Sequence, residues 1–129
     1  MVNQHRVIAG DPTLEMIVGY GKGSPDSLTC DEWRKNMLIY SLKHVGFTAY
    51  QAGSNSKFSG WSKWNMNQLF RKWPQYQDSR VQSFQLEIIH ELREDPGIAQ
   101  LTGEYVGMAI EDLITAPNFE TEIEIGTYI

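Results

Sequence analysis

The stretch TCDEWRKNMLIYSLKHVG, residues 29–46, carries the clearest helix signal in the chain. Thr29 precedes Glu32 by three residues, so each side chain can bind the other's backbone N–H group in a capping box. Gly46 can adopt the left-handed conformation that ends a helix. Spacings of four, three and four define the predicted buried stripe of Trp33, Met37, Tyr40 and His44. This stretch predicts an amphipathic helix.

On the N-terminal side, two short runs rich in β-favouring residues precede this helix. Residues 5–10 and 14–20 are separated by the turn sequence Gly-Asp-Pro and predict a β-hairpin. The glycine-rich residues 19–25 follow as a connection. They do not form a Walker phosphate loop, because Gly23 separates Lys22 from Ser24.

On the C-terminal side, residues 47–51 predict a short strand and residues 53–60 a polar loop. A second helix is expected from Ser62 to about Trp73, where Pro74 forbids its continuation. A third is expected from Ser79 to Asp95. Its predicted buried face consists of Val81, Phe84, Ile88 and Leu92.

Pro96 suits the first turn of a fourth helix, whose apolar residues 105–114 are expected to be largely enclosed. Residues 119–129 then alternate apolar and acidic side chains, which predicts a strand with Glu120, Glu122 and Glu124 on its solvated face. The expected fold is a single α+β domain, residues 1–129. It has an N-terminal β-hairpin, about four helices and a C-terminal strand, which form a small sheet packed by helices.

Composition narrows the class of protein. The chain has 129 residues, of which 41% are hydrophobic and 12% aromatic, enough to build a core. Cys30 is the single cysteine and cannot form an internal disulfide. No signal-peptide pattern and no run of about 20 apolar residues is present. These features predict a cytoplasmic protein without membrane association.

The net charge of −5 is unevenly distributed. Residues 33–80 contain eight basic side chains and one acidic one, whereas residues 81–129 contain ten carboxylates and only Arg93 as a cation. Two interpretations remain open. The acidic part can pair with the basic part inside the molecule, or the two can form a dipolar surface that serves two partners of opposite charge.

Between residues 57 and 80, aromatic and cationic side chains are interleaved, a combination that binds acidic protein surfaces or single-stranded nucleic acids. A helix core face decorated with cations gives the same pattern, and then the rings are buried. If the rings are exposed, they are contact anchors. The candidate partner-binding residues are Trp61, Lys63, Trp64, Arg71, Lys72, Trp73 and Tyr76.

Catalytic and metal-binding signals are weak. Glu87 and His90 have the spacing of a carboxylate-bridged metal site, but the chain contains no second copy of the motif. Cys30 at a helix start could have a lowered thiol pKa, yet no base or orienting partner accompanies it. His44 is interpreted as structural. The sequence therefore predicts no catalytic residues, no metal site, no cofactor and no small-molecule substrate.

These observations favour a non-enzymatic accessory or assembly protein that acts through protein–protein contacts or self-association. A nucleic-acid-associated protein is the alternative, with the same segment contacting phosphates and stacking on bases. No family signature is present, and the compact, aromatic-rich, motif-poor character would suit a phage or mobile-element accessory protein among many others.

Overall fold

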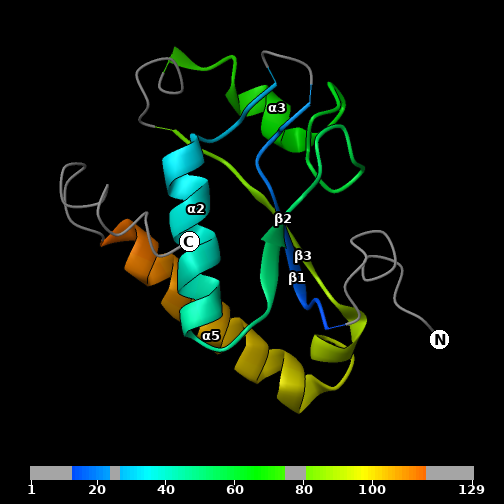
Figure 1. Cartoon of the computed structure of the whole chain (residues 1–129), viewed down its shortest axis with the longest axis vertical. Coiled ribbons are helices and arrows are strands. Elements are labelled where there is room, and N and C mark those ends of the chain that lie inside the picture. The colour runs from blue at the N-terminus through cyan, green and yellow to red at the C-terminus, as the bar shows by residue number, and fades with distance from the viewer. Residues whose placement is uncertain (1–12, 24–26, 75–80, 116–129) are drawn as a thin grey trace.

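The computed structural model describes residues 13–23, 27–74 and 81–115. Within these ranges the chain is α+β, as expected from the sequence, and its elements are shown in Figure 1. In chain order they are β1 (Met16–Gly19), α2 (Glu32–His44), β2 (Ala49–Gln51), α3 (Met66–Phe70), β3 (Gln85–Ile88), the 3-10 helix η1 (His90–Leu92) and α5 (Pro96–Ile114).

The sheet has the strand order β2-β1-β3. β1 pairs in parallel with β2, through the α2 crossover, and antiparallel with β3. All four residues of β1 are buried, as expected of a central strand with neighbours on both sides. The prediction of a strand within residues 14–20 is confirmed, but β1 is the centre of a mixed sheet rather than one arm of a hairpin. Residues 5–10 and 119–129, the other predicted strands, lie outside the described residues.

The start of α2 differs from the predicted capping box. Asp31 is the N-cap, and its Oδ1 accepts a hydrogen bond from the Arg34 N–H at 2.7 Å. Thr29 is buried instead, and its hydroxyl donates to the carbonyl of Ser83 at 2.8 Å. Its side chain therefore ties the entry of α2 to the segment before β3, an interaction over 54 positions that local spacing does not reveal.

The end of α2 is as predicted. Gly46 has φ +111°, its N–H donates to the Lys43 carbonyl, and the Phe47 N–H donates to the Leu42 carbonyl. These two bonds form a Schellman motif, which reverses the chain directly into the predicted 47–51 strand, observed as β2.

The predicted buried stripe of α2 is largely wrong. Met37 is buried, but Trp33 and Tyr40 are only half-buried and His44 is exposed, stacked on Tyr40 with ring centroids 6.1 Å apart. The face that packs inward consists of Leu38, Ile39 and Leu42. It is rotated from the predicted stripe because α2 packs against both the sheet and α5.

Helices α2 and α5 cover the same face of the sheet. The core between these layers consists of Met16, Val18, Leu38, Ile39, Leu42, Ala49 and Ala109. On the opposite face, a smaller cluster of Leu14, Ile17 and Ala52 packs against Phe58. Odd and even residues of β1 thus contribute to different faces, as the period of a strand requires.

The predicted third helix is wrong. Within residues 81–95 the structure shows β3 followed by η1. Phe84, Leu86 and Ile88 pack against the core from alternate positions, while Gln85 and Glu87 occupy the other face. The strand forms because β1 offers it a free edge.

The fourth helix, α5, runs over Pro96–Ile114 as predicted. Asp95 caps it by accepting from the Gly97 and Ile98 N–H groups, and Pro96 occupies its first turn. The expected enclosure of residues 105–114 is wrong, because only Thr102 and Ala109 of α5 are buried. Much of its apolar surface is therefore exposed.

Candidate functional site

Residues 57–73 contain one short helix, α3, rather than the long second helix expected from Ser62. α3 is capped by Asn65, whose Oδ1 accepts from the Asn67 N–H at 2.9 Å, while the Ser62 hydroxyl accepts from the Trp64 N–H upstream. Turns occupy most of the remaining positions. Instead of a helical core face, the segment contacts the sheet through a hydrogen bond from Asn65 Nδ2 to Gln85 Oε1 at 2.6 Å and through the packing of Phe58 against the cluster that contains Ile17.

The polarity of α3 is inverted relative to an ordinary amphipathic helix. Its buried side chain is Gln68, whose Nε2 donates to the carbonyls of Ser27 at 2.7 Å and Gly60 at 2.8 Å. Its large apolar side chains, Met66 and Leu69, are 72% and 55% exposed. Since burying a polar side chain while exposing apolar ones is costly, the outward apolar side chains call for an explanation beyond stability.

The three indoles of the segment lie at the surface. Trp64 is 84% exposed, with the Lys63 ammonium 5.0 Å from its ring centroid. Trp73 is 47% exposed and meets Phe70 edge to face, with ring centroids 4.8 Å apart. Trp61 is exposed to a lesser degree, since one side of it lies against Gly23. Tyr76 lies outside the described residues.

A hollow of about 450 Å³ in the same segment is lined by cations. Lys63, Arg71 and Lys72 contribute to its wall together with Gln68 and Leu69. The Gln68 Oε1 accepts a hydrogen bond from the Arg71 guanidinium at 3.2 Å, which couples the anchor of α3 to this wall. Three cations around one hollow favour a carboxylate or a phosphate as its occupant.

The two lysines of this hollow are not neutralised by any carboxylate in the described part of the chain. Among the residues that the structure describes, no carboxylate lies within ion-pair distance of Lys63 or Lys72. Figure 1 shows α3 and α5 at opposite ends of the sheet. The acidic residues of α5 are therefore remote from the cationic surface.

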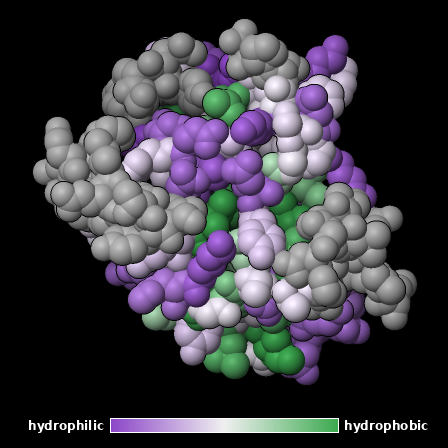
Figure 2. Space-filling model, viewed as in Figure 1, coloured by the Kyte–Doolittle hydropathy of each residue, from purple (hydrophilic) through white to green (hydrophobic). Residues whose placement is uncertain are grey.

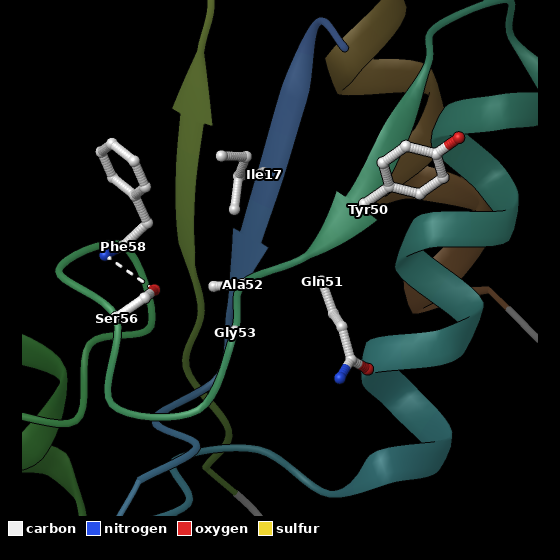
Figure 3. A pocket seen from close by; sticks show the side chains of 7 residues that line it. All are labelled: Ile17, Tyr50, Gln51, Ala52, Gly53, Ser56 and Phe58. Atoms are coloured by element: carbon white, nitrogen blue, oxygen red, sulfur yellow. Dashed lines mark hydrogen bonds between the residues drawn. The ribbon is translucent and has the colours of Figure 1, made fainter. Parts of the chain in front are cut away.

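A second hollow, of about 430 Å³, opens on the sheet face away from the helices (Figure 3). The rings of Tyr50 and Phe58 stand on either side of Ile17, and the Ser56 hydroxyl accepts from the Phe58 N–H. Its lining is Ile17, Tyr50, Gln51, Ala52, Gly53, Ser56 and Phe58. This lining contains no carboxylate, imidazole or ammonium group, and its apolar residues suit an apolar group. Sequence reasoning missed it because only strand pairing assembles it.

Near the start of α2, the buried side chains of Tyr20 and Lys35 share the carboxylate of Glu32. The Tyr20 hydroxyl donates to Glu32 Oε1 at 2.7 Å, and the Lys35 ammonium lies 3.0 Å from Oε2. Burial, and then the hydrogen bond and charge of Glu32, raise the pKa of Tyr20. Lys35 Nζ also donates to Asn36 and Gln51, and it lies 4.9 Å from the Tyr20 ring centroid. The cluster therefore joins α2 to the residue that follows β1 and to β2.

Cys30 does not have the activated environment considered from its sequence position. The thiol is fully buried, and burial, followed by the charge of Asp31, raises its pKa to about 12. Arg34 and Lys35 act in the opposite direction but do not outweigh burial. The side chain packs as a small apolar group.

This environment predicts slow modification of Cys30 by an aromatic disulfide reagent at pH 7, because the thiolate is both scarce and inaccessible. In urea above the unfolding midpoint, the reaction should accelerate by more than about a hundredfold, since the pKa returns toward its ordinary value. Absorbance of the released thiol measures both rates. Rapid modification of the folded protein would contradict the enclosed position of this side chain.

The structure also bears on the Glu87/His90 spacing and on membrane-spanning helices. Glu87 lies on β3 and His90 in η1, where His90 Nε2 lies 3.0 Å from Glu94, so the two residues do not share a helix face. Across residues 13–23, 27–74 and 81–115, no three His, Cys, Asp or Glu side chains gather in a metal-binding group. In the same ranges no helix has both the length and the apolarity needed to cross a bilayer.

Comparison of the chain with protein-family models, with curated proteins and with solved structures returns no match. The geometry of the surface formed by residues 57–73 is therefore what indicates a function.

Proposed function

We propose that this protein is a non-enzymatic accessory or assembly protein that binds an acidic protein partner through residues 57–73. The observation that carries the proposal is the inverted polarity of α3, in which Gln68 is buried while Met66, Leu69 and the neighbouring Trp64 face solvent. Exposed apolar side chains clustered in this way are typical of interaction sites.

The chemistry of the surface favours a protein as the partner. Tryptophan, methionine and arginine are enriched in protein interfaces, and this surface combines Trp64, Met66 and Arg71. Aliphatic side chains such as those of Met66 and Leu69 suit the apolar centre of an interface better than they suit a nucleobase. The cations around the hollow then select carboxylates on the partner's rim.

Trp64→Ala is expected to abolish most of this binding. A displayed library of random peptides, selected on the full chain, should yield sequences that combine Asp or Glu with large apolar residues. Loss of Trp64 should weaken the binding of a selected peptide by more than about thirtyfold, because a hot-spot tryptophan contributes at least about 2 kcal/mol. Fluorescence anisotropy of the labelled peptide measures the affinities.

Tyr50→Ala is the matched control, because Tyr50 is also exposed and lies beneath a lysine ammonium, that of Lys43, at 5.2 Å. It should leave the peptide affinity unchanged. Selected peptides without acidic residues, or with equal affinity for the wild type and Trp64→Ala, would contradict the proposal.

Single-stranded nucleic acid is the second candidate partner. The observation that favours it is the placement of three cations at one hollow in the same segment as the exposed ring of Trp64, which could receive a phosphate next to a stacked base. A labelled oligothymidylate of about 15 nucleotides, titrated at about 50 and about 200 mM salt, tests it. Affinity that falls steeply with salt and depends on Trp64 would favour nucleic acid, whereas absence of binding at both concentrations would exclude it.

A further inference from the structure

Helix α5 carries a second exposed apolar surface, at the other end of the molecule. Ile98, Leu101, Tyr105 and Met108 are each between 44% and 54% exposed. Their spacings of three, four and three residues are those of the a and d positions of a coiled-coil heptad. Figure 2 shows hydrophobic side chains at the lower edge of the molecule, over the first part of this helix.

This stripe is separate from the part of α5 that holds the fold together. Thr102 and Ala109, at the heptad e positions, are buried, and the Thr102 hydroxyl donates to the Leu92 carbonyl at 2.9 Å. Tyr105 meets the Phe47 ring edge to face, with ring centroids 6.5 Å apart, which holds the stripe at the boundary of the core. The side of the stripe formed by the e positions therefore belongs to the core, whereas the side formed by the g positions is exposed to solvent.

The charges on the exposed side indicate what covers the stripe. Glu104 and Glu111 occupy the two heptad g positions, Asp112 continues the a positions, and residues 96–114 contain no Lys, Arg or His. In an antiparallel pair of α5 helices, the g positions of the two copies would face each other and their carboxylates would repel. A second copy is therefore disfavoured, and a partner with cations along its apolar seam is favoured.

We infer that α5 is a docking site for an amphipathic helix of a partner protein, one with apolar a and d residues and with Lys or Arg beside them. The apolar seam supplies the contact area, and Glu104 and Glu111 select the charge of the partner. This site is independent of residues 57–73, and its ligand has the opposite charge. Together the two surfaces would let one molecule bridge two different partners.

A synthetic peptide of three heptads, with Leu at a and d and Lys at e and g, is the probe. Its lysines prevent it from pairing with itself, whereas the acidic flank of α5 accepts it. A second peptide with Glu in place of each Lys, the Glu twin, controls for binding through the apolar residues alone. The full chain should bind the Lys peptide at least about tenfold more tightly than the Glu twin, measured by anisotropy of the labelled peptides.

Two sets of variants locate the binding. Leu101→Asp should weaken the binding of the Lys peptide by more than about tenfold, whereas Ile110→Asp, at the f position of the same helix and similarly exposed, should not. The double variant E104K/E111K alters only exposed side chains and should reverse the preference toward the Glu twin. The E104K/E111K experiment therefore tests the inference even if Leu101→Asp does not fold.

Three results would overturn the inference. One is equal affinity for the two peptides, and another is an unchanged preference in E104K/E111K. The third is a concentration-dependent dimer of the full chain, seen by sedimentation velocity, that Leu101→Asp dissociates and Ile110→Asp leaves intact; it would assign the stripe to a second copy instead. A negative result in the Trp64→Ala peptide experiment would not affect the inference for α5, so the two proposals fail separately.

Discussion

Gly21→Ala is expected to lower the free energy of unfolding by more than about 3 kcal/mol, the largest effect among the substitutions discussed. Gly21 has φ +82°, and a Cβ there would lie 2.2 Å from the Ser27 carbonyl oxygen and 2.9 Å from the Thr29 nitrogen. Both are backbone atoms of the segment that enters α2, so neither can rotate away. The Gly21 N–H also donates to the Ser59 carbonyl at 2.6 Å, which couples this position to the approach to α3.

Gly46→Ala is the matched control for this prediction. Gly46 also has a positive φ, of +111°, but nothing lies within 4 Å of a Cβ built there. Its cost should be the conformational strain alone, about 1 to 2 kcal/mol. Urea unfolding followed by tryptophan fluorescence gives both free energies. Equal costs at the two positions would show that the close backbone approach at Gly21 is not a constraint.

Lys35→Met is expected to lower the free energy of unfolding by about 2 to 3 kcal/mol at pH 7. Lys35 is only 3% exposed, and its ammonium donates to Gln51 Oε1 at 2.6 Å as well as pairing with Glu32. Methionine replaces the apolar stem but makes none of these contacts. The expected loss stays below that of a fully buried pair because half of the Glu32 side chain is exposed and water can solvate it.

The same variant should change how stability depends on pH. Partial burial by itself raises the pKa of Glu32, but hydrogen bonds from Tyr20 and Lys35, with the charges of Lys35 and Lys22, hold it below its ordinary value of 4.5. A lowered folded-state pKa contributes stability that is complete above the unfolded-state pKa and is lost as pH falls through the folded-state value. Below pH 4.5 the wild type should therefore lose stability more steeply than Lys35→Met.

Lys43→Met provides the control, since it removes an exposed lysine from the last turn of the same helix. It should change stability by less than about 0.5 kcal/mol and leave the acid dependence intact. If the free energy of unfolding falls equally steeply below pH 4.5 in Lys35→Met and in the wild type, the Lys35–Glu32 pair does not set the pKa of Glu32.

Elements whose signals are local were predicted well. Gly46 ends α2 because glycine adopts a positive φ cheaply, and α5 starts at Pro96 because a first-turn proline loses no helical hydrogen bond. Residues 84–88 were misread because Phe84 and Ile88, four apart, share a face in a helix and in a strand alike. Leu86 distinguishes the two, and the free edge of β1 decided in favour of the strand.

The candidate site, too, could be predicted only in part from the local sequence. The interleaving of rings and cations identified the 57–80 segment, but its orientation depends on Gln68, whose amide reaches the carbonyls of Ser27 and Gly60. No spacing rule selects a glutamine as the inward side chain of a helix that also contains Met66 and Leu69. The exposed stripe of α5 was missed for the same reason, since an apolar helix is expected to be enclosed when its neighbours are unknown.

By itself, the sequence determined the α+β class, the C-terminal end of α2, the start of α5, the position of β1 and the separation of basic from acidic residues. These follow from backbone conformational preferences and from charge, which act over a few positions. Tertiary structure alone decided which faces are buried, that β1 lies between a parallel and an antiparallel neighbour, and that the cationic hollow lies far from α5. Burial is shared among segments distant in sequence, so a side chain's exposure depends on which partners the folded chain brings against it.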